Sequence, residues 1–123
     1  MSDRPVKIPD ASHPITVTPT AERVRVYAGD TLIADTTESL TLQESTYPAV
    51  QYVPLSAIDP AVLSTTETST YCPFKGDATY YSVTTPEGTV VDAGWNYAAA
   101  YEAVAEIKDH VAWYPDRVRL VVG

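Results

Sequence analysis

One short turn holds the residues best suited to chemistry, Cys72-Pro73-Phe74-Lys75-Gly76, which contains the only cysteine and the only phenylalanine of the chain. Between Arg25 and Lys108, Lys75 is the single Lys or Arg side chain. An ammonium group binds carboxylates and phosphates, or serves as an amine where it is desolvated. The turn is therefore the place where this acidic chain is expected to hold an anion.

Each residue of this candidate site has a functional and a structural interpretation. Lys75 either binds a ligand or forms an ion pair with Glu44 or Asp77 that pins the turn. Cys72 is a candidate nucleophile whose thiolate Lys75 would favour, or a small buried apolar side chain. Glu44 ends an alternating segment, where it is a candidate general base, a partner of Lys75 or an exposed strand-end carboxylate.

A histidine and several aromatic residues complete the candidate set. His13 lies between prolines and could cap the pocket as an acid or base, although a surface position fits equally well. Trp95 and Tyr80 are candidate pocket walls, with Tyr114 as a further ligand-binding candidate, because tyrosines near a lysine suit a planar or sugar-like ligand. Most of the aromatic residues must nevertheless fill the core, since the chain has one Phe and one Met.

Composition excludes several classes of function. The formal charge of −8 argues against nucleic acid and against an anionic membrane surface, because neither is bound without a basic face. One cysteine forms no intrachain disulfide, and one Cys with two His falls short of the usual zinc ligands, so no metal or other cofactor is expected. The N-terminus leads into no apolar run, and a cytoplasmic location follows by default.

The elements that must position these residues are mostly strands. Residues 1–12 are polar and Pro-rich, which predicts a flexible N-terminal arm, and residues 13–123 form a single β-rich domain. Alternation of polar and apolar residues and turn signals predict strands over 23–28, 31–36, 39–43, 50–53, 77–84, 89–97 and 118–122.

Two segments are predicted to be helical. Leu55 to Leu63 should form one or two turns with a start at Asp59-Pro60. Ala98 to about Lys108 is the only segment that reads as a longer helix, with Asn96 as its N-cap. These patterns predict a mainly β (α+β) fold with compact antiparallel sheets, tent-like or sandwich-like, and one short helix in the C-terminal half.

Motifs along nearly the whole chain resemble a known family. They are His13-Pro14-Ile15, Tyr27-Ala28-Gly29-Asp30, Glu44-Ser45-Thr46-Tyr47-Pro48, Tyr52-Val53-Pro54, the segment from Cys72 to Tyr81, Trp95-Asn96-Tyr97, and Ala112 to Val118. Together they resemble the family called domain of unknown function 427, with the Cys-Pro-x-Lys-Gly core as the most specific element. The resemblance implies a small, single-domain, β-rich protein of the bacterial type, with a tent-like pair of antiparallel sheets.

A nucleotidyltransferase label attached to that family finds no support in the residues. Such chemistry usually needs two carboxylates at positions i and i+2 to hold magnesium ions. The chain contains no such pair, and no phosphate-binding glycine motif.

Two functional hypotheses remain. The first is a pocket around Lys75 and Glu44 that binds a small, anionic molecule, with or without catalysis. The second is a non-catalytic module that binds a protein or forms a homodimer through a strand edge. The first predicts that Lys75 and Glu44 share one concave site.

Overall fold

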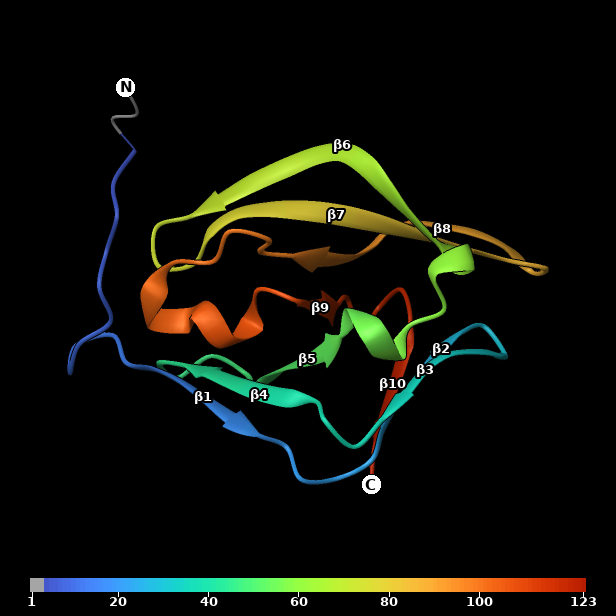
Figure 1. The fold of residues 1–123 in the computed structure, drawn as a ribbon, viewed down its shortest axis with the longest axis horizontal. Coiled ribbons are helices and arrows are strands. Elements are labelled where there is room, and N and C mark those ends of the chain that lie inside the picture. Colours follow the sequence, from blue (N-terminus) through green and yellow to red (C-terminus); the bar gives the residue numbers. More distant parts are fainter. Residues whose placement is uncertain (1–3) are drawn as a thin grey trace.

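Ten β-strands and three short 3-10 helices make up the described part of the chain, residues 4–123, in a computed structural model (Figure 1). Residues 1–3, the start of the predicted arm, lie outside the described residues. All strand pairs in this part of the chain are antiparallel. The predicted mainly β fold with antiparallel sheets is confirmed.

The larger sheet has seven strands in the order β1-β4-β5-β9-β8-β7-β6. Their bounds are β1 Ile15–Pro19, β4 Leu40–Glu44, β5 Val50–Pro54, β9 His110–Trp113, β8 Gly88–Asn96, β7 Gly76–Thr85 and β6 Leu63–Cys72. The sheet is strongly bent, and Figure 1 shows β6, β7 and β8 across from β1 and β4. The two halves of the bent sheet meet at the short central strand β9.

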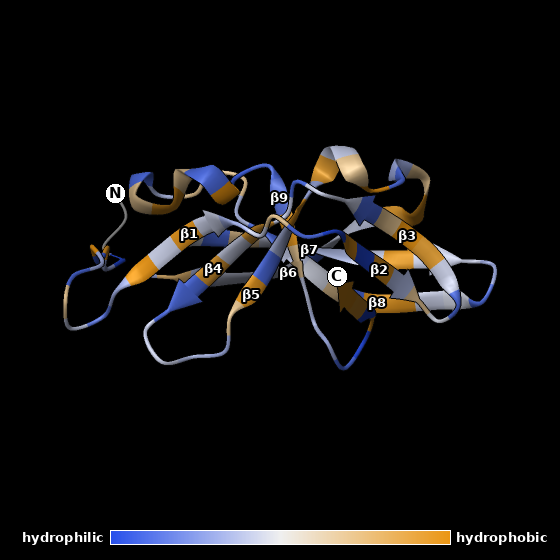
Figure 2. Cartoon of the chain, turned by 90° about the horizontal axis from the view of Figure 1, so that it is seen from below, coloured by the Kyte–Doolittle hydropathy of each residue, from blue (hydrophilic) through white to orange (hydrophobic). Residues whose placement is uncertain are grey.

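The smaller sheet has three strands in the order β10-β2-β3, with β2 Val24–Ala28, β3 Thr31–Thr36 and β10 Arg119–Val122. Figure 2 shows β2 and β3 at one side of the molecule and β1, β4 and β5 at the other, with hydrophobic and hydrophilic residues mixed along the strands. The predicted hairpins at Gly29-Asp30 and Pro86-Glu87-Gly88 are both present, as β2–β3 and β7–β8.

Two separate clusters of buried side chains hold the sheets together. The aliphatic core packs the small sheet on the large one and contains Val24, Val26, Ile33, Val53, Ile58, Val83, Val111 and Val118, with Trp113. The tyrosine core lies on the opposite face of β5 and β9, where it packs η3 on the large sheet, and contains Tyr52, Tyr80 and Tyr97 with Leu42, Ala78, Val104, Ile107 and Ala112.

The helical predictions are confirmed in one segment and corrected in the other. Two 3-10 turns, η1 Leu55–Ala57 and η2 Pro60–Val62, occupy the first segment, and the Asp59 carboxylate accepts a hydrogen bond from the Ala61 backbone N–H at 2.9 Å. The predicted helix from Ala98 to Lys108 is wrong in extent and type. The structure has the 3-10 helix η3 Glu102–Ile107, which is interrupted at Val104 (φ −130°, ψ 27°).

Tertiary hydrogen bonds explain why the longer helix does not form. Asn96 does not cap it, because this buried residue ends β8 and donates from its side-chain amide to the carbonyls of Lys108 and His110, both at 2.7 Å. The backbone N–H of Tyr101 donates to the Lys75 carbonyl at 3.0 Å. These bonds fix the residues before η3 outside a helix, and they tie η3 to the turn that carries Lys75.

Three strands, β1, β6 and β9, were not predicted from the sequence pattern. β6 is Thr-rich and largely exposed at the sheet edge, so it shows no apolar alternation, although threonine itself favours strands. β9 is four residues long and mostly buried, too short to be told from the end of a helix.

Candidate functional site

The turn between β6 and β7 sets the direction of Lys75. The Lys75 backbone N–H donates to the Cys72 carbonyl at 3.2 Å, with Pro73 at the second position of the turn, which its fixed φ favours. Gly76 then takes φ +112°, a conformation that residues with a side chain rarely adopt. This geometry reverses the chain within four residues and aims the Lys75 side chain back into the molecule, where the residue is buried.

Lys75 forms an ion pair with Glu44, one of the two partners that the sequence suggested. Its Nζ lies 2.5 Å from Glu44 Oε1, and the two side chains are 11% and 14% exposed. The other suggested partner, Asp77, instead forms an ion pair with Arg4. The Lys75 ammonium also lies 5.9 Å from the centre of the Tyr97 ring, so one of its neighbours belongs to the tyrosine core.

Glu44 is held at the end of β4 by a tight change of chain direction. The next residue, Ser45, adopts φ 48°, and its N–H donates to the Pro14 carbonyl at 2.7 Å. The Glu44 carbonyl accepts from the Tyr47 N–H at 2.9 Å. Positive φ is uncommon for a residue with a side chain, so this turn is tolerated because its hydrogen bonds fix it.

His13 reaches the same carboxylate from the opposite side. Its Nε2 lies 2.8 Å from Glu44 Oε2, and its ring stacks on Phe74 with 4.3 Å between ring centres. The Asp10 carboxylate accepts hydrogen bonds from the Ser12 hydroxyl at 2.6 Å, the Ser12 N–H at 2.8 Å and the His13 N–H at 3.2 Å. This small turn places the imidazole over the end of β4.

Opposing effects act on the Glu44 carboxyl. Burial is the largest single effect and by itself raises the pKa of this group. Hydrogen bonds from Lys75 and His13, together with their charges, outweigh burial and hold the pKa of Glu44 below its ordinary value. Glu44 is therefore a carboxylate at neutral pH and bridges a cation and an imidazole.

Cys72 lies next to this cluster. Its Sγ is 3.8 Å from Lys75 Nζ, and the residue is partly exposed. A carboxylate, an ammonium group, an imidazole and a thiol thus come together from three places in the sequence. We call His13, Glu44, Cys72 and Lys75 the site cluster.

A cleft with a volume of about 780 Å³ opens over the site cluster. Glu44, His13 and Cys72 line it directly, whereas Lys75 lies behind Glu44 and is not part of the lining. The rest of the lining comes from the N-terminal segment, the turn after β4 and the β6–β7 turn: Lys7, Ile8, Asp10, Ser12, Tyr47, Pro73 and Phe74. Of the ion pair, only Glu44 lines the concave site, and Lys75 reaches it through its contact with Glu44.

The three remaining aromatic candidates lie together, but away from this cleft. The ring centres of Trp95 and Tyr114 are 4.7 Å apart, and those of Tyr80 and Tyr114 are 6.4 Å apart. The Tyr80 and Thr70 hydroxyls form a hydrogen bond at 2.9 Å. Trp95 lines a different hollow of 210 Å³ beside Val50. The structure thus brings together Lys75, Glu44, His13 and Cys72, and separates Tyr80, Trp95 and Tyr114 from them.

Sequence reasoning missed several residues that line the cleft, above all Lys7, Asp10 and Phe74. Phe74 carried a signal, because it is the only phenylalanine of the chain and follows the only cysteine by two residues. Asp10 with Ser12 is a local side-chain-to-backbone turn of a kind that short polar residues favour. Lys7 carried no signal, because only the fold brings residue 7 to the β6–β7 turn.

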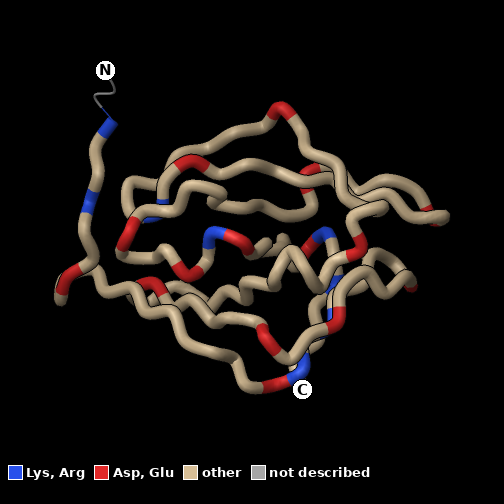
Figure 3. Tube along the Cα trace, in the orientation of Figure 1, with Lys and Arg blue, Asp and Glu red and all other residues tan. Residues whose placement is uncertain are grey.

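Basic positions are few in this acidic chain, and some of them lie along the segment near the N-terminus (Figure 3). Asp10 and Glu44 contribute negative charge to the lining of the cleft, and Lys7 contributes positive charge. Within residues 4–123 no three His, Cys, Asp or Glu side chains are arranged to hold a metal ion. In the same part of the chain, no helix has the length and apolar character needed to span a bilayer.

Fold and site together define a small antiparallel β protein with a buried ion pair beneath an open cleft. The chain belongs to the family described as domain of unknown function DUF427, whose model matches residues 16–123. The match includes Glu44, Cys72 and Lys75, whereas His13 and Lys7 precede it. No curated protein matches the chain.

Proposed function

We propose that the protein binds a small anionic molecule in the cleft over the site cluster. The observation that carries this proposal is the Lys75–Glu44 ion pair, which is largely buried beneath a cleft of about 780 Å³. Buried ion pairs are often no more stabilising than apolar residues of the same volume, so stability alone is a weak reason to build one. Perturbed ionisable groups under a cleft are typical of functional sites.

The charge of the site cluster supports an anion as the ligand. Lys75 balances Glu44, and the Asp10 carboxylate already accepts three hydrogen bonds from Ser12 and His13. Lys7 contributes a cation to the lining of the cleft, where a bound anion would contact it.

The same groups are suited to catalysis if the bound molecule reacts. Cys72 would be the nucleophile, with the Lys75 ammonium 3.8 Å from its sulfur. His13 would carry a proton, oriented by its hydrogen bond to Glu44. A cytoplasmic location, where a thiol stays reduced, fits this role of Cys72.

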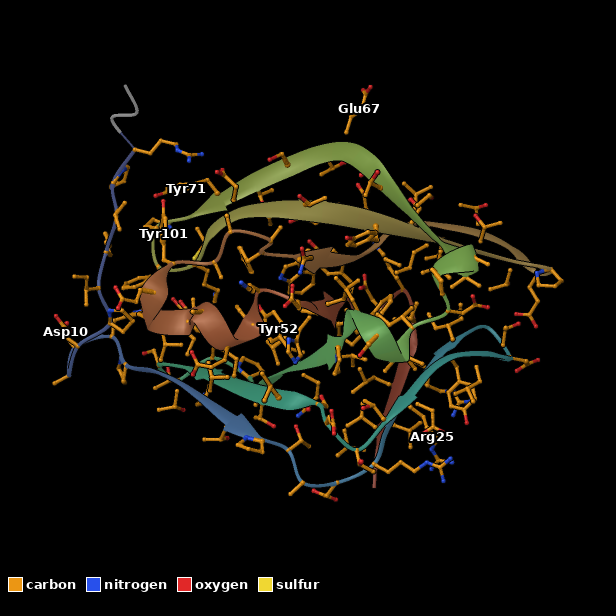
Figure 4. The ribbon with its side chains drawn as sticks, in the orientation of Figure 1. Asp10, Arg25, Tyr52, Glu67, Tyr71 and Tyr101 are labelled. Carbon is orange, nitrogen blue, oxygen red and sulfur yellow. The ribbon has the colours of Figure 1, made fainter. Side chains whose placement is uncertain are left out.

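The alternative function, a protein-interaction or homodimerisation module, has one observation in its favour. β6 is ten residues long, and of the described strands it pairs only with β7, so its outer edge is available for a further strand. However, the pairing is irregular between Thr65 and Ser69, and Glu67 projects from this bulge (Figure 4). A bulge and a charge both discourage edge-to-edge pairing, so we favour the ligand site. Light scattering of concentrated protein would show the dimer that the alternative requires.

Thermal unfolding in the presence of anions tests the proposal. A panel of phosphate, citrate, nucleotides and simple carboxylates would be added to the wild type, His13→Gln and Lys75→Met, with Asp35→Asn as the control at a surface ion pair. A ligand present at about 100 times its Kd stabilises the fold by about 2.7 kcal/mol. We expect at least one anion to stabilise the wild type and the control, and not the two site variants. The proposal fails if no anion acts, or if the shift persists in both site variants.

A further inference from the structure

A second hollow lies directly beside the cleft and is apolar. It has a volume of about 410 Å³ and is lined by Val6, Lys7, Ile8, Phe74, Tyr101, Glu102 and Ala103. We call it the apolar groove. Its walls come from the N-terminal segment, the β6–β7 turn and the start of η3.

The walls of the groove are fixed by hydrogen bonds. The backbone N–H of Lys7 donates to the Pro73 carbonyl at 2.9 Å, which holds the N-terminal segment to the β6–β7 turn. The hydroxyl of Tyr71 donates to the Pro5 carbonyl at 2.6 Å and lies 2.8 Å from the Tyr101 hydroxyl. Figure 4 shows Tyr71 and Tyr101 close together beside this segment. The groove is therefore preformed.

Apolar side chains are left exposed in this groove. Ile8 is 79% exposed, the highest value among the exposed large hydrophobic residues of the described chain, and Val6 is 60% exposed. Exposed apolar residues that gather around a concave surface mark a binding site more often than scattered ones do. The groove thus offers apolar surface that a ligand could cover.

The groove and the cleft are continuous. Three residues, Lys7, Ile8 and Phe74, line both of them. At this junction the Lys7 ammonium lies 6.0 Å from the centre of the Phe74 ring, and His13 stacks on that ring. An elongated molecule can therefore contact the Lys7 ammonium at the junction and apolar groups of the groove at the same time.

We infer that the ligand is an amphipathic carboxylate, whose charged head lies in the cleft near Lys7 and His13 and whose apolar chain lies in the groove. This inference rests on the proposed function, which it deepens by naming the class of ligand. Lys7 at the junction fixes the position of the head, because Asp10 and Glu44 in the cleft and Glu102 at the groove all repel an anionic group.

A series of straight-chain carboxylates tests the inference by isothermal titration calorimetry. Butanoate, hexanoate, octanoate and decanoate would be compared, each below its micelle concentration, with the alcohols of the same length as uncharged controls. Fully buried methylenes increase affinity by about fourfold each. We expect a gradient of about two- to fourfold per methylene for the acids, and markedly weaker binding of the alcohols.

Two exposed residues provide matched variants that should fold normally. Ile8→Ser alters the groove, and Val91→Ser alters an exposed valine elsewhere, on β8. Ile8→Ser should flatten the gradient to less than about twofold per methylene while butanoate still binds, and Val91→Ser should leave it unchanged. His13→Gln should weaken all the acids by a similar factor.

The outcomes separate the two claims. If anions bind in the cleft without any dependence on chain length, the proposed function stands and this inference is overturned. The inference is also overturned if the gradient persists in Ile8→Ser, or if alcohols bind as tightly as acids. If no anion binds at all, the proposed function fails, and the amphipathic ligand fails with it.

Discussion

The two cores of this protein differ in composition, and the difference follows the site. In the aliphatic core, Val24, Val26 and their neighbours are fully buried, and Trp113 is its one buried aromatic residue. The tyrosine core buries Tyr52, Tyr80 and Tyr97 and adjoins the Lys75–Glu44 pair. Burial raises the pKa of Tyr52 and of Tyr97, so both phenols stay neutral.

This contrast shows that the two cores contribute differently to the stability of the fold. The aliphatic core joins the two sheets mainly through buried apolar side chains, whose removal from water is the dominant stabilising effect in a small domain. The tyrosine core combines apolar rings with polar ends, and it supports a lysine that an apolar residue of similar volume could replace. We interpret the first core as the framework and the second as the support of the site.

Replacing Glu44 alone should give the largest effect on stability. Glu44→Leu leaves the Lys75 ammonium buried without its carboxylate, and breaking one partner of a buried pair typically costs about 3–5 kcal/mol. Urea unfolding of the variant and the wild type measures the loss. A loss below about 1 kcal/mol would mean that water solvates Lys75 well enough to do without Glu44.

Truncating one isoleucine in each core should separate framework from site. Ile33→Ala in the aliphatic core and Ile107→Ala in the tyrosine core each remove a buried side chain and should each cost roughly 3 kcal/mol. Only Ile107→Ala should also weaken anion binding, because Ile107 packs in η3, which is tied to the Lys75 turn through Tyr101. Equal binding by the two variants, measured by calorimetry, would remove the distinction between the cores.

The Glu44 carboxylate should make the protein sensitive to acid. Because Lys75 and His13 hold the pKa of Glu44 below its unfolded value of about 4.3, its stabilisation is complete above that pH. It is lost as the pH falls through the lower, folded-state pKa. Unfolding free energies measured between about pH 5 and pH 3 should therefore fall more steeply in the wild type than in Glu44→Gln. The other carboxylates are common to both proteins and cancel, so parallel curves would contradict the assignment.

The smallest effect is expected at the surface pair of Arg23 and Asp35. These side chains are 56% and 33% exposed, and water and salt screen their attraction. Asp35→Leu should unfold at nearly the same urea concentration as the wild type. A loss as large as that of Glu44→Leu would show that burial does not distinguish the two ion pairs.

The sequence was sufficient to predict the strands with regular alternation and the turns with glycine or proline. An isolated cation in an acidic chain also predicted a carboxylate partner for Lys75, either Glu44 or Asp77, and the structure selects Glu44. The helix after β8 was overestimated: its periodicity was real, but a hydrogen bond from the Asn96 side chain to Lys108 and one from Tyr101 to the Lys75 carbonyl set another path. Trp95 and Tyr80 lie away from the cleft because only the packing of the sheet decides which side of the core an aromatic ring fills.

The sequence could not predict that the segment containing Lys7 and His13 lies against the site. Lys7 and His13 reach the site through contacts with the turn at Pro73 and with Glu44, residues far away along the chain. No local pattern encodes such contacts. By contrast, the Cys-Pro-x-Lys-Gly motif, which contains Cys72 and Lys75, was recognised because its residues lie close together in the sequence.

The most direct test of the account replaces both partners of the buried pair at once. Glu44→Leu combined with Lys75→Met puts apolar side chains of similar volume in the place of the two charges. We predict a double variant at least as stable in urea as the wild type, although Glu44→Leu alone is strongly destabilised, and a complete loss of stabilisation by anions. A double variant that is less stable by about 3 kcal/mol or more, or one that still responds to anions, would contradict the claim that this pair is kept for binding.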